Sequence, residues 1–342
     1  MKYRLLASTM ALSMTVAVAN AQEQKSNLFN QVSHIELGVT LGTTGIGFDV
    51  AIPATDKVWL RTGFSYMPKV EVPMTFDVQA LQEGEDPANS QSNFNKMADV
   101  LYNITGYQAK PGVEMLGKPN FWHWNFMVDV FPFENNPHWH ATVGFFLGPS
   151  KVAEAYNRTE CMPSLMSVNI YNRMYDKLHG KTLRELVKEP LFNIPGLEDF
   201  GTDPELLLEL QKRLDNYGRM GIWLGNYKQG EEDEEGNIRH NPYMMDPDEN
   251  CMVSAEMRVN AFKPYLGIGY EGRLIKDENR LSIGFDAGIL LWGGTPHLKT
   301  HDGTDLIHDV ENVLGKVGDY ANTIEKFKVF PLLNLRVAYK LF

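Results

Sequence analysis

The chain ends in a segment where apolar and polar side chains alternate strictly. One face of residues 333–341 is apolar and the other carries an amide and two cations: Leu333, Leu335, Val337, Tyr339 and Leu341 against Asn334, Arg336, Ala338 and Lys340. A β-strand shows one face at every second residue, so this pattern predicts a strand. Its apolar face suits either the core of a soluble sandwich or the lipid around a membrane barrel.

Seven earlier segments alternate in the same way, which makes eight predicted strands. The third of them can continue past Pro68 to about Val78. The eight segments are His34–Leu41, Ile46–Ile52, Val58–Met67, Phe121–Phe133, His138–Leu147, Phe262–Arg273, Leu281–Trp292 and Leu333–Leu341.

The connections between these strands fall into two length classes. Strands two and three, four and five, and six and seven are joined by short turns, whereas three of the other four connections are long. Short turns at one rim and long loops at the other are typical of an outer-membrane barrel. The pattern therefore predicts an all-β membrane fold: an eight-stranded, antiparallel, up-and-down transmembrane β-barrel.

The longest connection, residues 149–259, is too long to lack structure of its own. Thr182 and Glu185 fit a capping box, and Asp203-Pro204 fits the start of a helix that ends at Gly218. An earlier helix ends at Gly180, and a hairpin is expected between residues 222–228 and 237–243. We therefore predict a large α-helical extracellular loop insertion. Further helices are expected at residues 93–104 and 305–326.

The first 21 residues have the pattern of a secretory signal peptide. Two cations precede an apolar stretch, which ends in Ala19-Asn20-Ala21. The predicted mature protein, residues 22–342, is thus exported to the cell outer membrane, with membrane lipid and the barrel-assembly machinery as partners. A net charge of −11 at pH 7 makes nucleic acid an improbable partner.

The predicted strands point charged residues toward the barrel interior. Eight strands enclose room only for packed side chains, so we interpret these charges as ion pairs that fill the lumen, rather than as a path for solutes. The residues of this predicted network are Glu36, Asp49, Arg61, Asp129, Lys263, Glu271, Arg273, Asp286, Arg336 and Lys340.

The two cysteines, Cys161 and Cys251, lie near the beginning and the end of the long insertion. Export to an oxidising compartment favours a disulfide between them, and two reduced thiols remain the alternative. His123, His138 and His140 point inward, but they are expected at opposite rims and therefore not in one metal site. We identify no catalytic, cofactor-binding or metal-binding set, and we expect no cofactor.

Several motifs in order resemble a known family. They are Thr43-Thr44-Gly45-Ile46-Gly47, Asp129-Val130-Phe131-Pro132-Phe133, the segments 264–270 and 281–288, and Phe327–Leu333. Together they resemble a largely uncharacterised family of Gram-negative, Bacteroidetes-like outer-membrane β-barrel proteins with eight strands. The chain departs from that family in its longer insertion and in Phe342, which is out of phase with the lipid-facing positions. The resemblance implies no catalytic residues.

Three functions are compatible with this sequence. The first is an outer-membrane barrel whose surface loop domain binds an unidentified ligand or envelope partner without catalysis. The alternatives are a small solute channel and an outer-membrane hydrolase acting at the loop rim. The packed lumen weakens the channel, and the missing catalytic set makes an enzyme the less favoured reading.

Overall fold

The computed structural model describes residues 34–81, 94–99, 102, 106–182, 185, 204–232, 236, 238–275, 278–313, 315–326 and 328–341. The predicted signal peptide, residues 1–21, and Phe342 lie outside these residues. Among the described helices, none is both long enough and apolar enough to cross a membrane.

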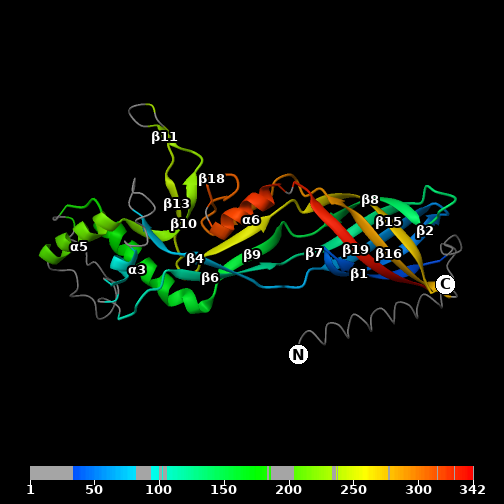
Figure 1. Ribbon diagram of the computed structural model, residues 1–342, viewed down its shortest axis with the longest axis horizontal. Helices are drawn as coiled ribbons and strands as arrows, with labels where there is room; N and C mark the ends of the chain where they lie inside the picture. The colour runs from blue at the N-terminus through cyan, green and yellow to red at the C-terminus, as the bar shows by residue number, and fades with distance from the viewer. Residues whose placement is uncertain are drawn as a thin grey trace.

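Eight antiparallel strands form a closed barrel, as the sequence predicts (Figure 1). Each strand pairs with its neighbour in sequence among the eight, and β1 closes the barrel by pairing with β19 over Glu36–Gly42. The strands are β1 (Glu36–Gly42), β2 (Gly45–Thr55), β3 (Val58–Tyr66), β7 (Trp122–Val130), β8 (Trp139–Leu147), β15 (Phe262–Ile275), β16 (Glu278–Leu290) and β19 (Phe330–Lys340).

The alternation in sequence becomes a difference between the outside and the inside of the barrel. On β19, Leu333 and Leu335 point outward and are 59% and 60% exposed. Arg336, the residue after Leu335, points inward and is 3% exposed. The same holds on β15, where Leu266 and Ile268 point outward and Tyr265 is buried. The barrel therefore carries its apolar side chains on the outside.

The β1–β2 connection is a two-residue turn that needs a glycine. Gly42 pairs with Gly45 across Thr43 and Thr44, and Gly45 has a φ of +92°. A Cβ atom on Gly45 would lie 2.2 Å from the carbonyl oxygen of Tyr66. Both the backbone conformation and the close approach of β3 therefore exclude a larger side chain.

Five barrel strands continue into a second sheet beyond the rim. Its strand order, β17-β14-β9-β6-β4, repeats the barrel order β16-β15-β8-β7-β3. In the part of the chain that the structure describes, no strand of this sheet lies above β19, β1 or β2, so the second sheet is open above the β1–β2 turn. Its strands are β4 (Val72–Asp77), β6 (Gly112–Pro119), β9 (Lys151–Asn157), β14 (Ser254–Arg258) and β17 (His297–Thr300).

The described parts of the three long connections, which span residues 67–121, 148–261 and 291–329, form one structural unit with this sheet, which we call the loop domain. It lies at the end of the barrel opposite the C-terminus (Figure 1). Besides the second sheet it contains η3 (Thr159–Cys161), α3 (Met162–Leu178), α5 (Pro204–Tyr217), α6 (Gly315–Lys326), β5 (Gln79–Leu81), β10 (Arg219–Tyr227), β11 (Glu231–Glu232), β12 (Ile238–Arg239), β13 (Pro242–Met245) and β18 (Val310–Glu311).

The loop domain has an apolar core built from all three connections. Val113 of the first, Tyr171 and Leu214 of the second and Leu306 of the third belong to one buried cluster. The Tyr171 hydroxyl donates a hydrogen bond to the carbonyl oxygen of Gly218 at 2.6 Å, which ties α3 to the end of α5. Burial raises the pKa of Tyr171, so the hydroxyl stays protonated and remains a donor.

Two sequence predictions about the loops need correction. The insertion at 149–259 contains two of the predicted helices, α3 and α5, and the predicted hairpin, in which β10 pairs with β13. It is not mainly helical, however, because its described residues also form the strands β9, β11, β12 and β14. The helix expected at 305–326 begins only at Gly315. Residues 305–313 instead form a turn, where the Asp305 carboxylate accepts hydrogen bonds from backbone N–H groups, and the short strand β18.

Candidate functional site

The lumen of the barrel is organised around two buried arginines. Arg61, on β3, lies between two carboxylates: its Nη1 donates to Asp286 at 2.7 Å and its Nη2 donates to Asp129 at 3.1 Å. Thr142 donates a further hydrogen bond to Asp129, and His140 contacts Asp286 at 3.2 Å. Every charge in this group therefore has an opposite charge or a hydrogen bond within reach, as buried charges require.

Arg336, on β19, makes the second group with three carboxylates. Its Nη2 donates to Asp49 at 2.8 Å, and its Nη1 lies 3.3 Å from Glu36 and 2.9 Å from Glu271. Gly38 leaves room for this group, because a Cβ atom there would lie 2.7 Å from the Asp49 carboxylate and 2.8 Å from Arg336 Nε. The glycine on β1 thus permits the ion pair beside it.

These two groups fill the lumen between them. The cavity that Asp49, Arg61 and Asp286 line has a volume of only about 10 Å³, which is room for one water molecule at most. Three members of the predicted network stand apart from both arginines: Arg273 is exposed, Lys340 lies half-buried at the end of β19, and Lys263 is at the other mouth of the barrel.

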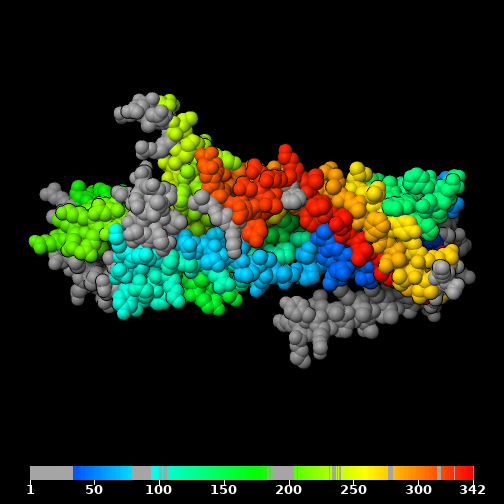
Figure 2. Space-filling model, in the orientation of Figure 1, coloured from blue at the N-terminus to red at the C-terminus, as the bar shows by residue number. Residues whose placement is uncertain are grey.

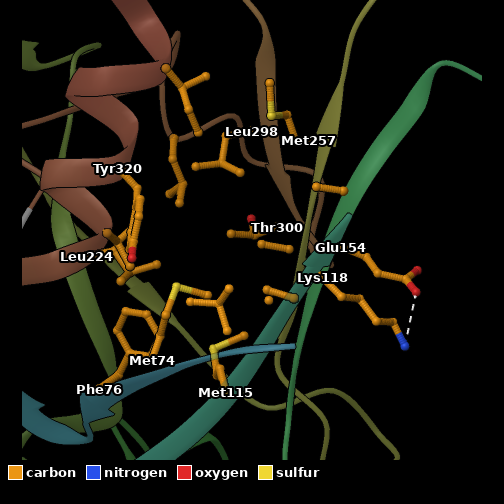
Figure 3. Close-up of a pocket in the computed structure, with 18 of the residues that line it drawn as sticks. Met74, Phe76, Met115, Lys118, Glu154, Leu224, Met257, Leu298, Thr300 and Tyr320 are labelled. Atoms are coloured by element: carbon orange, nitrogen blue, oxygen red, sulfur yellow. Dashed lines mark ion pairs between the residues drawn. The ribbon is translucent and has the colours of Figure 1, made fainter. Parts of the chain in front are cut away.

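An apolar space lies above the barrel, between α6 and the second sheet. This upper cavity has a volume of about 380 Å³. Figure 3 shows side chains from several strands and α6 converging on it. Its lining is almost wholly apolar and rich in methionine: Met74, Phe76, Met115, Ala153, Ala155, Leu224, Met245, Met257, Leu298, Leu306, Val317 and Tyr320 are among the residues that surround it.

The upper cavity is open toward solvent on one side. Val72 on β4 and Tyr320 on α6 both line it, and each is 45% exposed. Figure 2 shows the hollow between the blue surface of β4 and the orange-red surface of α6, with green atoms of deeper strands visible inside. The mouth therefore lies on the side where the second sheet has no strands above β1 and β2.

The two charged side chains near the upper cavity, those of Lys118 and Glu154, are directed away from it. Lys118 and Glu154 form an ion pair at 3.4 Å that points to the other side of the sheet (Figure 3). A hydrogen bond from Lys118 to the hydroxyl of Tyr156 raises the pKa of Lys118, which keeps its charge on this outer face. The pleat of β6 and β9 thus separates an apolar inner face from a charged outer one.

A second, lower cavity connects the upper cavity with the barrel mouth. It has a volume of about 160 Å³ and shares three lining residues with the upper cavity: Pro119, Ala153 and Met257. Trp292 and Phe330 form part of its apolar wall. The two cavities are therefore adjacent along one inner face, from the solvent-exposed mouth at β4 to the top of the barrel.

Two buried polar side chains lie at the bottom of the lower cavity. Lys263 is 2% exposed, and its ammonium group makes only one hydrogen bond among the described residues, to the carbonyl oxygen of Ala261 at 3.5 Å. His123 is 3% exposed, and neither of its ring nitrogens has a hydrogen-bond partner in the same part of the chain. A buried ammonium without a carboxylate is costly, so this floor is suited to an anion from outside the chain.

The predicted disulfide is absent from this structure. Cys161 and Cys251 are free thiols. Cys161 precedes α3 and its sulfur contacts the backbone of Glu114, whereas the sulfur of Cys251 contacts Asn169 at 3.7 Å.

Sequence reasoning missed the cavities because their walls come from every long connection. Met74, Ala153 and Tyr320 lie far apart in the chain and meet only after the three connections fold together. Lys263 was predicted as one member of a lumen network. The apolar neighbours that isolate it, Trp292 and Phe330, flank other strands, so no local pattern marks it as different.

The comparisons with known proteins add little to this description. No protein-family model matches the chain, and no curated protein matches it either. The family resemblance seen in the motifs therefore remains a prediction.

Among solved structures, the chain is similar to CarO2 of Acinetobacter baumannii, with a TM-score of 0.35, 13% identity, and coverage of 91% of this chain and 100% of that one. CarO of the same organism has a TM-score of 0.35 and 12% identity over 90% of this chain and 97% of that one. A major outer membrane protein of Thermus thermophilus has a TM-score of 0.26 and 11% identity over 90% and 98%. These values are too low to carry an argument about function.

Proposed function

We propose that the protein is an outer-membrane β-barrel protein whose surface loop domain binds a single-chain amphiphile with an anionic head group. The observation that carries this proposal is the floor of the lower cavity, beneath an apolar space. Lys263 is buried there with only a backbone carbonyl as a partner, and His123 has no hydrogen-bond partner among the described residues. The amphiphile places its head group beside Lys263 and its chain in the two cavities.

The membrane location is supported by the outer surface of the barrel. Large apolar side chains are exposed on all eight strands, among them Val39, Phe48, Leu60, Val143 and Leu335. A contiguous apolar surface of this kind would drive association in water, whereas the acyl chains of a bilayer satisfy it. Unboiled protein from outer-membrane fractions should run faster on a detergent gel than boiled protein, and a soluble periplasmic protein would contradict the location.

The chemistry of the upper cavity supports a flexible apolar chain. Met74, Met115 and Met257 are unbranched and adapt their shape to what they contact. Its volume of about 380 Å³ is within the range of ordinary ligand sites, and its lining supplies little to orient a polar ligand. The mouth between β4 and α6 opens directly above the β1–β2 turn, so a chain leaving the outer leaflet would have a short path into it.

Binding is tested with palmitate and with hexadecanol, which has the same chain and no charge. Protein in nanodiscs avoids competition from detergent. We expect palmitate to bind more tightly than hexadecanol, because the Lys263 ammonium gains a carboxylate partner. The substitution Lys263→Met should remove about tenfold or more of the palmitate affinity and leave hexadecanol binding nearly unchanged.

The cavity is tested separately with Ala153→Phe, since Ala153 lines both cavities. This change should weaken both ligands. The matched control is Ala141→Phe, on the outer face of β8, which should bind both ligands as the unaltered protein does. Equal binding of both ligands by Ala153→Phe and the unaltered protein would refute the site, whatever the membrane location.

The structure of the lumen argues against the alternative of a solute channel. The ion pairs of Arg61 and Arg336 leave a space of about 10 Å³. We therefore expect no steady conductance when the protein is inserted in a planar bilayer.

A further inference from the structure

A cluster outside the cavities has the donor set of a transition-metal site. His297 on β17, Asp305 and His308 each offer one ligand atom, and these three atoms all lie within 4.8 Å of one another. Nδ1 of His297 is 2.6 Å from Oδ2 of Asp305, and Nδ1 of His308 is 3.1 Å from the same oxygen. Two imidazoles and one carboxylate thus converge on one point.

A tight turn of the backbone after β17 brings the three residues together. After β17 the chain turns at residues 301–304, and the Leu306 N–H donates to the carbonyl oxygen of Leu298 at 2.8 Å. The Asp309 N–H then donates to the carbonyl oxygen of Asp305, closing one helical turn. His308 therefore lies on the same face as Asp305, three residues earlier, and this face meets His297 on the strand.

The Asp305 carboxylate is held in place independently of the histidines. Its Oδ1 accepts hydrogen bonds from the N–H groups of Leu298 and Ile307, at 3.2 and 3.1 Å. Asp305 is only 4% exposed, so Oδ2 is left to face the two rings. A ligand oriented by hydrogen bonds to its other atom is the arrangement that protein metal sites use.

The two rings are free to complete a coordination sphere. Their centroids are 4.5 Å apart with an angle of 28°, and the side chains of His297 and His308 are 52% and 42% exposed. Ligand atoms around a tetrahedral Zn²⁺ lie about 3.3 Å apart. To reach this spacing, the 2.6 Å contact must lengthen by about 0.7 Å and the 3.1 Å contact by about 0.2 Å, which the exposed rings allow, and water has access to the remaining position.

We propose that His297, Asp305 and His308 bind a divalent transition-metal ion of the Zn²⁺ class, with solvent at the fourth position. Two imidazole nitrogens and one carboxylate are ligands that Zn²⁺ prefers, whereas Ca²⁺ and Mg²⁺ prefer oxygen ligands alone. The ion ties β17 to the turn after it. Leu298 and Leu306, beside the ligands in sequence, line the upper cavity, so metal occupancy stiffens one wall of that cavity.

The test uses the full chain without a histidine tag, stripped of metal and titrated with Zn²⁺ against a chromophoric chelator. We expect one tight equivalent, and a loss of about tenfold or more in affinity for His297→Ala and for His308→Ala. Both side chains are exposed, so both variants should retain the barrel, which the mobility of unboiled protein verifies. Co²⁺ should give visible absorption in the unaltered protein that each variant loses.

The matched control is His179→Ala. His179 is also an exposed histidine of the loop domain that contacts one aspartate, Asp215 at 2.7 Å, but no second histidine of the described residues faces that carboxylate. This variant should bind Zn²⁺ as the unaltered protein does. The absence of a tight equivalent in the unaltered protein, or equal affinity in all three variants, would overturn the assignment. Neither result bears on amphiphile binding, which is measured without metal.

Discussion

The barrel and the loop domain place their apolar and charged residues in opposite directions. In the barrel, Leu335 is 60% exposed while Arg336 beside it is 3% exposed. In the loop domain, Leu165 on α3 is fully buried while the neighbouring Met166 is 51% exposed. One chain thus contains a barrel with apolar residues outside and charges inside, and a loop domain with the opposite arrangement. Five barrel strands lead directly into the sheet of the loop domain.

The difference shows where the two regions obtain their stability. The loop domain buries apolar surface away from water, as soluble domains do. The barrel gains its interior order from ion pairs and from the closed ring of strand hydrogen bonds, and its apolar side chains require a partner outside the chain. The cavities lie at the boundary between the regions, where the apolar face of the second sheet meets the polar interior of the barrel.

The largest expected effect is on the barrel interior. Arg336→Met should destabilise the barrel by about 3–5 kcal/mol, because Glu36, Asp49 and Glu271 lose their shared cation in a buried place. Urea unfolding in detergent micelles, followed by the gel mobility of unboiled protein, measures this change. Arg273→Met, on an exposed arginine, is the control and should have almost no effect.

Adding Asp49→Asn to Arg336→Met should recover part of the loss, since one of the three unpaired carboxylates becomes neutral. No recovery, together with a small effect of Arg336→Met alone, would show that the lumen is hydrated and not packed as described.

The next effect is on the core of the loop domain. Leu165→Ala should cost about 2–5 kcal/mol of local stability, because it opens a cavity in a fully buried position. Limited proteolysis should show faster cleavage within the loop domain while the barrel keeps its mobility shift. Met166→Ala, on the adjacent exposed residue, should be cleaved at the rate of the unaltered protein. Loss of the barrel together with the loop domain would mean that the two regions unfold as one.

The smallest of the three effects is on the outer surface of the barrel. If this surface faces lipid, Leu335→Arg near the middle of β19 should cost about 2–4 kcal/mol in a bilayer. The same change at Ile238, a 66% exposed residue of the loop domain, should cost almost nothing because it faces water. Unfolding titrations in lipid vesicles compare the two variants. Equal stability would contradict the lipid-facing assignment and would abolish the contrast between the regions.

The sequence alone determined the barrel. Apolar and polar side chains alternate along its strands with a period of two residues, because each strand has one face toward the lumen and the other toward the outside. The positions of Arg61, Asp129 and Arg336 on the inner face followed from the same alternation. Which carboxylate pairs with which arginine did not, because partners such as Arg61 and Asp286 are 225 residues apart and meet only when the ring closes.

Only the tertiary structure decided the nature of the loops, the cavities and the metal cluster. The strands of the second sheet are four to eight residues long, and all of them except β4, which pairs with β6 of its own connection, pair with a segment from another connection. Their local pattern is therefore too short to separate them from turns and helices. The isolation of Lys263 depends on how the three connections pack together, and no single stretch of sequence contains that information.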